Sequence, residues 1–96
     1  MQFLAISRTR TDIYSDADLA PLLETEAQHV RTLYIEGAVR QSWYRGDERG
    51  ACSILEADSL DAAHTLIKSL PLVKAGMLER IHLIPPIPYR GFGPRS

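Results

Sequence analysis

One carboxylate stands in the sequence where an apolar residue is expected. Glu26 falls inside residues 18–36, where apolar residues recur at spacings of three and four, and this period predicts an amphipathic helix. If Glu26 faces the core with those residues, it loses water and its pKa rises. Such a carboxyl can take and return a proton near neutral pH, so Glu26 is a candidate catalytic base. Alternatively, Glu26 lies at the margin of the apolar face and pairs with an arginine.

Two histidines lie near apolar helix faces. His29 follows Glu26 by three residues, so the two side chains can share one turn of the helix. His64 lies beside the apolar face of a second predicted helix, residues 58–70. We treat His64 as a candidate catalytic residue and His29 as a candidate for binding substrate; a structural role is the alternative for each. A Glu-x-x-His motif can bind metal, but no second ligand cluster accompanies this one, so no metal site is predicted.

A predicted strand at residues 38–45, "AVRQSWYR", carries three further candidates for substrate binding. Arg40 could bind a substrate carboxylate through two parallel hydrogen bonds, or form an ordinary salt bridge. Trp43 could line the site or belong to the core. Because Arg40 and Trp43 are three residues apart, they lie on opposite faces unless a bulge intervenes. Tyr44 shares the face of Arg40 and could donate a hydrogen bond.

The elements that must position these residues follow the order βαββαβ. Four strand-like runs and two helix-like runs alternate along residues 1–85, and residues 86–96 form a tail rich in proline and glycine. Capping and turn residues mark the helix boundaries: Ser15 or Asp16, Gly37, and Asp58 or Ser59. This order predicts one ferredoxin-like α+β domain, in which two helices cover one face of a four-stranded antiparallel sheet.

The other face of the predicted sheet is not cleanly polar. In the last strand, strict alternation places Met77, Glu79, Ile81 and Leu83 on one face and Leu78, Arg80, His82 and Ile84 on the other. A sheet with one face in water alternates apolar and polar residues more strictly than this. We therefore expect a second copy to cover that face, which gives a dimeric α+β barrel.

Composition excludes several classes of protein. The 96 residues include 11 basic and 12 acidic side chains without a basic stripe, so nucleic-acid binding is not expected. A single cysteine, Cys52, cannot form an internal disulfide. No run approaches the roughly 20 apolar residues that span a membrane, and the first residues lack a signal-peptide pattern. We expect a cytoplasmic protein with no membrane partner.

Residues 26–72 resemble the muconolactone isomerase family. The shared features are short motifs in register without a gap: Glu36-Gly37, Arg40 with Trp43, Ser59 with Ala62 and His64, Leu70-Pro71-Leu72, and a glutamate equivalent to Glu26. The resemblance implies a homodimer or ring-like homo-oligomer, and a cofactor-free reaction in which a base moves a proton beside a lactone carbonyl. Three residues depart from the family pattern: Gln41, Ser42 and Arg45. The changes at Gln41 and Ser42 favour a changed substrate.

Two functions follow from these observations. The first is an isomerase of aromatic catabolism that acts on a small unsaturated lactone or related acid, with Glu26 as base. The alternative is a non-catalytic small-molecule-binding or accessory protein on the same scaffold. The connector between the second helix and the last strand, residues 69–76, is unusually apolar for a loop. It is covered either by a subunit interface or pocket rim, or by the helix core of its own monomer.

Overall fold

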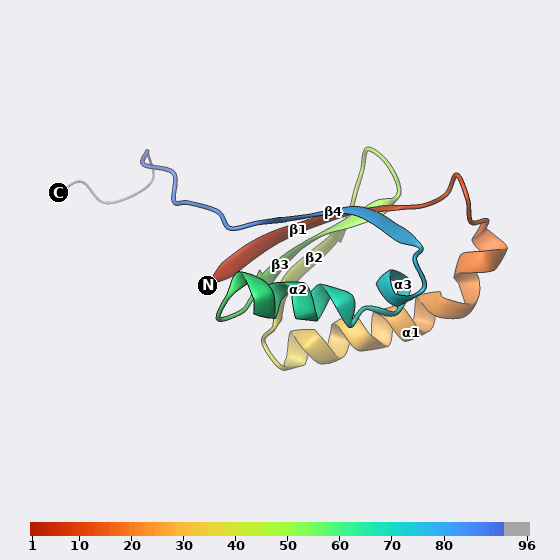
Figure 1. The fold of residues 1–96 in the computed structure, drawn as a ribbon, viewed down its shortest axis with the longest axis horizontal. Helices are drawn as coiled ribbons and strands as arrows, with labels where there is room; N and C mark the ends of the chain where they lie inside the picture. Colours follow the sequence, from red (N-terminus) through yellow and green to blue (C-terminus); the bar gives the residue numbers. More distant parts are fainter. Residues whose placement is uncertain (92–96) are drawn as a thin grey trace.

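The predicted order of elements is confirmed. The structure is a computed structural model that describes residues 1–91, apart from the side chain of Arg80. Its elements are β1 (Gln2–Thr9), α1 (Asp16–Ile35), β2 (Val39–Tyr44), β3 (Gly50–Glu56), α2 (Leu60–Lys68), α3 (Pro71–Lys74) and β4 (Leu78–Ile84). The strands form one antiparallel sheet in the order β2-β3-β1-β4, and the helices lie together on one side of it (Figure 1). This is the ferredoxin-like arrangement.

Local signals set the helix ends as expected. Ser15 caps α1: its hydroxyl accepts from the Asp18 N–H at 3.2 Å, and the Asp18 carboxylate accepts from the Ser15 N–H at 2.8 Å. Gly37, with a φ of 85°, turns the chain out of α1. Ser59 caps α2 by accepting from the Ala62 N–H at 3.0 Å.

The connector is not a plain loop, as the sequence had suggested, because it contains the one-turn helix α3. Pro71 occupies the first turn of α3, where its missing N–H removes no helical hydrogen bond. Leu72 is buried, and Leu70 and Val73 pack against the core of the same monomer. The connector therefore contributes apolar side chains to the core of one chain.

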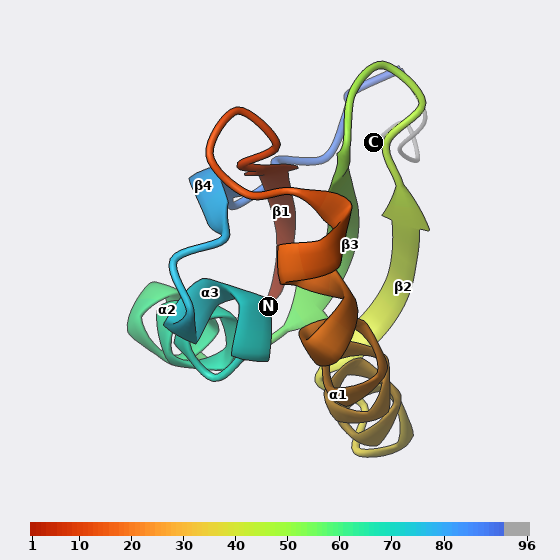
Figure 2. The same cartoon turned by 90° about the vertical axis from the view of Figure 1, so that its right-hand side faces the viewer.

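Figure 2 shows the helices on one side of the sheet, and the buried side chains of the core come from both layers. Phe3 on β1 and Leu19 on α1 have the largest fully buried side chains, and each such burial contributes about 1.5–3 kcal/mol. The central cluster of buried residues joins all layers: Phe3, Ala5, Leu33, Val39, Leu55, Ala63 and Ile67. Within residues 1–91, no helix has the length and apolar character needed to cross a membrane.

The strict alternation predicted for β4 is wrong, because the strand contains an irregularity. His82 pairs with Ile6 and Glu79 with Arg8, so β4 uses one residue more than β1 between these two pairs. The bulge turns Leu78 toward the helices and Glu79 toward the opposite face. The helix-facing side of β4 is therefore apolar.

The sheet face away from the helices is divided into two parts. Apolar side chains from all four strands share one part: Leu4, Ile6, Trp43, Cys52, Ile54 and Ile84. At the other end, Glu79 forms ion pairs with Arg8 and Arg10. After β4 the chain leaves the body of the molecule, and Ile87 in this segment is 88% exposed (Figure 1).

Candidate active site

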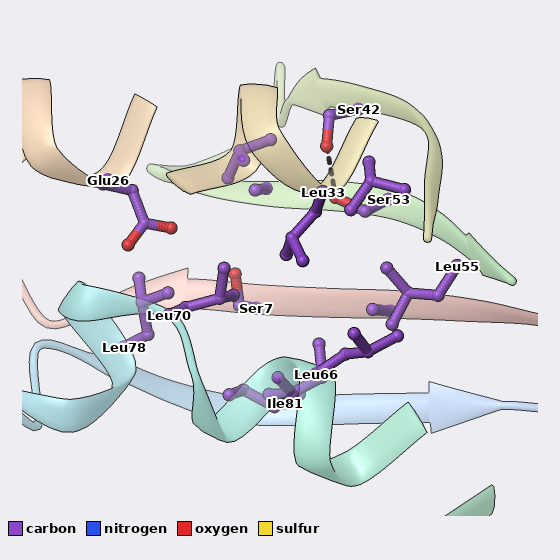
Figure 3. A pocket seen from close by; sticks show the side chains of 15 residues that line it. Ser7, Glu26, Leu33, Ser42, Ser53, Leu55, Leu66, Leu70, Leu78 and Ile81 are labelled. Atoms are coloured by element: carbon purple, nitrogen blue, oxygen red, sulfur yellow. Dashed lines mark hydrogen bonds between the residues drawn. The ribbon is translucent and has the colours of Figure 1, made fainter. Parts of the chain in front are cut away.

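Two adjoining hollows lie between the helices and the sheet. The inner cavity, about 80 Å³, is almost wholly apolar, and Figure 3 shows Glu26 at one end and the hydrogen-bonded Ser42 and Ser53 hydroxyls, 2.5 Å apart, on its wall. The outer groove, about 690 Å³, opens between α1 and the β2–β3 hairpin. Both hollows are lined by Glu26, Val30, Val39, Ser42, Ala51 and Leu78. Glu26 therefore stands where an enclosed apolar space meets an open one.

The Glu26 carboxyl has the environment that its place in the apolar helix face predicts. Burial raises its pKa; the hydrogen bond from the Leu72 N–H and the nearby charge of His29 act in the opposite direction. Its Oε1 accepts from the Leu72 N–H at 2.9 Å. Glu26 forms no ion pair with any arginine or lysine that the structure describes, so its alternative role as a salt-bridge residue finds no support.

The two histidines lie outside both hollows. The His29 Nε2 is 2.8 Å from the Ser69 Oγ, at the start of the connector. His64 is exposed on α2. Neither side chain contributes to the lining of the cavity or of the groove in the single chain. Their roles in substrate binding and catalysis stay predictions.

The candidates on β2 separate into two groups. Tyr44 lies on the helix-facing side of β2, lines the outer groove and is 94% exposed. Trp43 borders the same groove along β2, but its pairing through Cys52 with Ile6 places its side chain on the open sheet face, where it is 49% exposed. A bulge between Val39 and Gln41 contains Arg40, whose guanidinium lies beside Gly37 and not in the groove. The structure thus brings together Glu26 and Tyr44, and leaves Arg40 and the Trp43 side chain outside.

Sequence reasoning missed the cations of the groove, which are Arg31, Arg45 and Arg49. Asp47 holds Arg45 through two hydrogen bonds, 3.0 Å from Nε to Oδ1 and 2.7 Å from Nη2 to Oδ2; this pairing raises the pKa of Arg45 and lowers that of Asp47. Arg49 pairs with Asp16 at the start of α1. Arg31 forms no ion pair with any described residue, so it is a cation available to a ligand.

Gly50 is the signal that could have located two of these arginines. A Cβ at this position would lie 2.1 Å from the Ser7 carbonyl oxygen, and its φ of 156° also favours glycine. Gly50 therefore lets the β2–β3 hairpin approach β1 closely. This approach brings Arg45 within 3.3 Å of the same Ser7 carbonyl oxygen.

No cluster of three histidine, cysteine, aspartate or glutamate side chains suited to a metal ion occurs among the described residues. Fold and site together define a small ferredoxin-like α+β protein with a desolvated carboxyl at the floor of a groove that carries arginines and aromatic residues.

The protein is a member of a known family. Residues 1–85 match the sequence model of the muconolactone delta-isomerase family, to which the chain belongs. The solved structure of a muconolactone isomerase is 21% identical, with a TM-score of 0.79 over 100% of this chain and 97% of that chain. These findings confirm the resemblance carried by the short motifs.

A second solved structure is similar to this chain. It is a 5-chloro-2-hydroxyhydroquinone dehydrochlorinase from Burkholderia phenoliruptrix AC1100, in complex with 2,5-dihydroxybenzoquinone. It is 20% identical, with a TM-score of 0.69 over 95% of this chain and 98% of that chain. At these identities the likeness of both structures concerns the fold. A search of curated protein sequences finds no significant match.

Proposed function

We propose that the protein is a cofactor-free enzyme that moves a proton within a small unsaturated lactone or a related acid. Glu26 is the base. The observation that carries the proposal is the state of this carboxyl, which is desolvated, has no arginine or lysine partner among the described residues, and borders the groove. A carboxylate bound to an arginine would be held in its ionised form; Glu26 can exist in both forms.

The chemistry needs one base and one group that stabilises negative charge. Glu26 removes a proton from the carbon beside the lactone carbonyl, and the electrons of that C–H bond move into a dienolate. The protonated Glu26 then returns the proton to another carbon of the dienolate, which moves the double bond. Oε1 is bound to the Leu72 N–H, whereas Oε2 has no hydrogen bond with any described residue, so Oε2 is the oxygen that carries the proton.

The groove supplies the groups that stabilise the dienolate oxygen. Arg31 is the available cation, and the Tyr44 hydroxyl is a donor on the facing strand. Arg45 is held by Asp47 and acts as a fixed positive charge. Arg40, His29 and His64, which line neither hollow in one chain, act on substrate only if a second copy completes the site.

The proposal includes a homodimer formed through the sheet faces. The apolar part of the open face, which carries Leu4, Ile6 and Ile54, supports it, because a partner sheet would remove these side chains from water. Further assembly into a ring stays a prediction from the family resemblance, and location in the cytoplasm stays a prediction from the sequence pattern.

Binding without catalysis is the second candidate function. The outer groove is lined by two exposed aromatic side chains, Tyr34 and Tyr44, which suit a flat ring. The dehydrochlorinase of similar fold is in complex with a benzoquinone. On this alternative, Glu26 serves only to hold the connector through Leu72.

A proton-exchange assay separates the two functions. The protein is incubated with muconolactone in deuterated buffer, and both isomerisation and deuterium uptake are followed by NMR. We expect turnover that is lost in Glu26→Gln and kept in Glu24→Gln, a matched change on the exposed side of α1. If well-folded protein shows no exchange above the uncatalysed rate, muconolactone is excluded as the substrate.

A further inference from the structure

Helix α1 holds the connector at two points that are three residues apart. Glu26 accepts from the Leu72 N–H at 2.9 Å, and the His29 Nε2 lies 2.8 Å from the Ser69 Oγ. Residues three apart share one face of a helix, so both contacts come from the same side of α1. One contact involves the proposed base, and the other lies one turn farther along.

The single proton of the Ser69 hydroxyl decides which group donates in the hydrogen bond between His29 and Ser69. The Ser69 hydroxyl donates to the Leu66 carbonyl oxygen at 2.6 Å, because a carbonyl can only accept. A serine hydroxyl carries one proton, so Ser69 must accept from His29. The His29 Nε2 therefore carries a hydrogen, in the neutral tautomer protonated at Nε2 or in the imidazolium. The chain of donors runs from His29 through Ser69 to the end of α2.

The contact with Leu72 depends on where the connector lies. The residue before α3, Leu70, provides no side-chain cap, and Pro71 has no N–H. The Leu72 N–H is thus the first backbone donor of α3, and Glu26 satisfies it. Because Ser69 lies two residues before α3, the His29–Ser69 hydrogen bond limits how far this turn can move from α1.

We propose that His29 and Ser69 are positioning residues for Glu26: their hydrogen bond fixes the connector against α1 so that the Leu72 N–H meets the carboxylate. The inference rests on the proposed role of Glu26 as base. A donated N–H stabilises the ionised carboxylate, which is the form that removes a proton. The connector thereby keeps a buried base from remaining protonated, and His29 acts through Ser69 and Leu72 without touching the substrate.

Several groups besides Leu72 face Glu26 and influence its titration. His29 lies on the same helix, and β1, β3 and β4 contribute only neutral side chains to the cavity, among them Ser7, Ser53 and Leu78. The titratable and charged groups of the outer groove are Arg31, Tyr34, Tyr44, Arg45 and Arg49. The test must therefore change the hydrogen bond while leaving these groups in place.

Two matched pairs of variants change the hydrogen bond between His29 and Ser69 and leave the groups of the groove in place. Ser69→Ala removes the acceptor, and Ser69→Thr keeps a hydroxyl. His29→Leu removes the donor, and His29→Gln keeps an N–H donor at a similar reach; neither carries the charge of His29. Within each pair, charge is constant and only the hydrogen bond differs. If one pair fails to fold, the other still provides the comparison.

The measurement is the titration of the Glu26 carboxyl, followed by the ¹³C shift of its Cδ without substrate and assigned with Glu26→Gln. We expect the midpoint to lie at higher pH in Ser69→Ala than in Ser69→Thr, and at higher pH in His29→Leu than in His29→Gln. The Leu72 amide proton should follow the same titration in the wild type and lose it in Ser69→Ala.

The outcomes distinguish this inference from the proposed function. If the two members of a folded pair titrate alike, the positioning role is overturned, whatever the activity. Because the titration is measured without substrate, failure to turn over muconolactone would count against the proposed function only. An isomerase whose acid limb moves to higher pH in Ser69→Ala and returns in Ser69→Thr would support both.

Discussion

Two glutamates on opposite faces of the same sheet illustrate how the surroundings decide what a carboxylate does. Glu79 on β4 contacts the Arg8 guanidinium directly, and its Oε2 lies 3.5 Å from the Arg10 Nε. Glu26 on α1 is surrounded by apolar side chains and receives one backbone N–H. Both are partly buried, but of the two only Glu79 forms ion pairs with arginines that the structure describes. Two guanidinium groups lie against the first carboxylate, whereas burial raises the pKa of the second.

The largest effect should come from Glu26→Gln. We expect proton exchange to fall about 10²–10⁴-fold, the usual loss when a general base is removed. Thermal stability at neutral pH should stay the same or rise, because glutamine still accepts from the Leu72 N–H and the desolvated charge is gone. Activity and melting temperature are measured on the same sample. A clear loss of stability would mean that the carboxylate itself is structural.

Glu79→Gln should show the opposite pattern. Arg8, whose side chain is 20% exposed, loses its closest carboxylate, and we expect a loss of about 1–3 kcal/mol in the free energy of unfolding. Urea denaturation measures this loss. Asp12→Asn removes a more exposed partner of Arg8 and should cost less than about 1 kcal/mol. If Glu79→Gln lowers proton exchange in folded protein, the contrast between the two glutamates fails.

The pH dependence of stability should also reveal the buried carboxyl of Glu26, the feature that distinguishes it from Glu79. Burial raises the pKa of Glu26 above its ordinary value of 4.5, so the folded state favours the protonated carboxyl. Its contribution to stability is fully present below pH 4.5 and is lost as pH rises through the folded pKa. The melting temperature of Glu26→Gln minus that of the wild type should therefore increase over this window and then level off. A difference that shrinks with rising pH would contradict the raised pKa.

The smallest effect should come from Tyr44→Phe. The Tyr44 side chain is 94% exposed, so stability should change by less than about 0.5 kcal/mol. If the hydroxyl donates to the dienolate oxygen, proton exchange should fall about 2–10-fold, the equivalent of one hydrogen bond. An unchanged rate would remove Tyr44 from the site and leave Arg31 as the main stabilising group.

The sequence predicted those features that depend on local residues. The caps at Ser15 and Ser59 and the end of α1 at Gly37 follow from backbone preferences and short-range hydrogen bonds. The desolvation of Glu26 follows from the period of the apolar residues around it. Each of these signals is contained within one or two helical turns.

Features that depend on distant partners could not be predicted in this way. The bulge in β4 is set by its pairing with β1, so the face of Glu79 was assigned wrongly. Pro71 suggested a break in the chain, although it begins the short helix α3 against α1. Arg45 and Arg49 reach the groove because the hairpin folds toward β1. In each case tertiary packing decides the outcome.

Gly46 and Gly50, at the two ends of one short turn, should differ sharply in a saturation mutagenesis screen. A Cβ at Gly46 would meet no atom within 4 Å, so many amino acids should be accepted there. Every replacement at Gly50 would press on the backbone of β1 and move the hairpin that carries two groove arginines. The amino acids accepted at each of the two positions would then show, without any ligand, which end of the hairpin determines the shape of the groove.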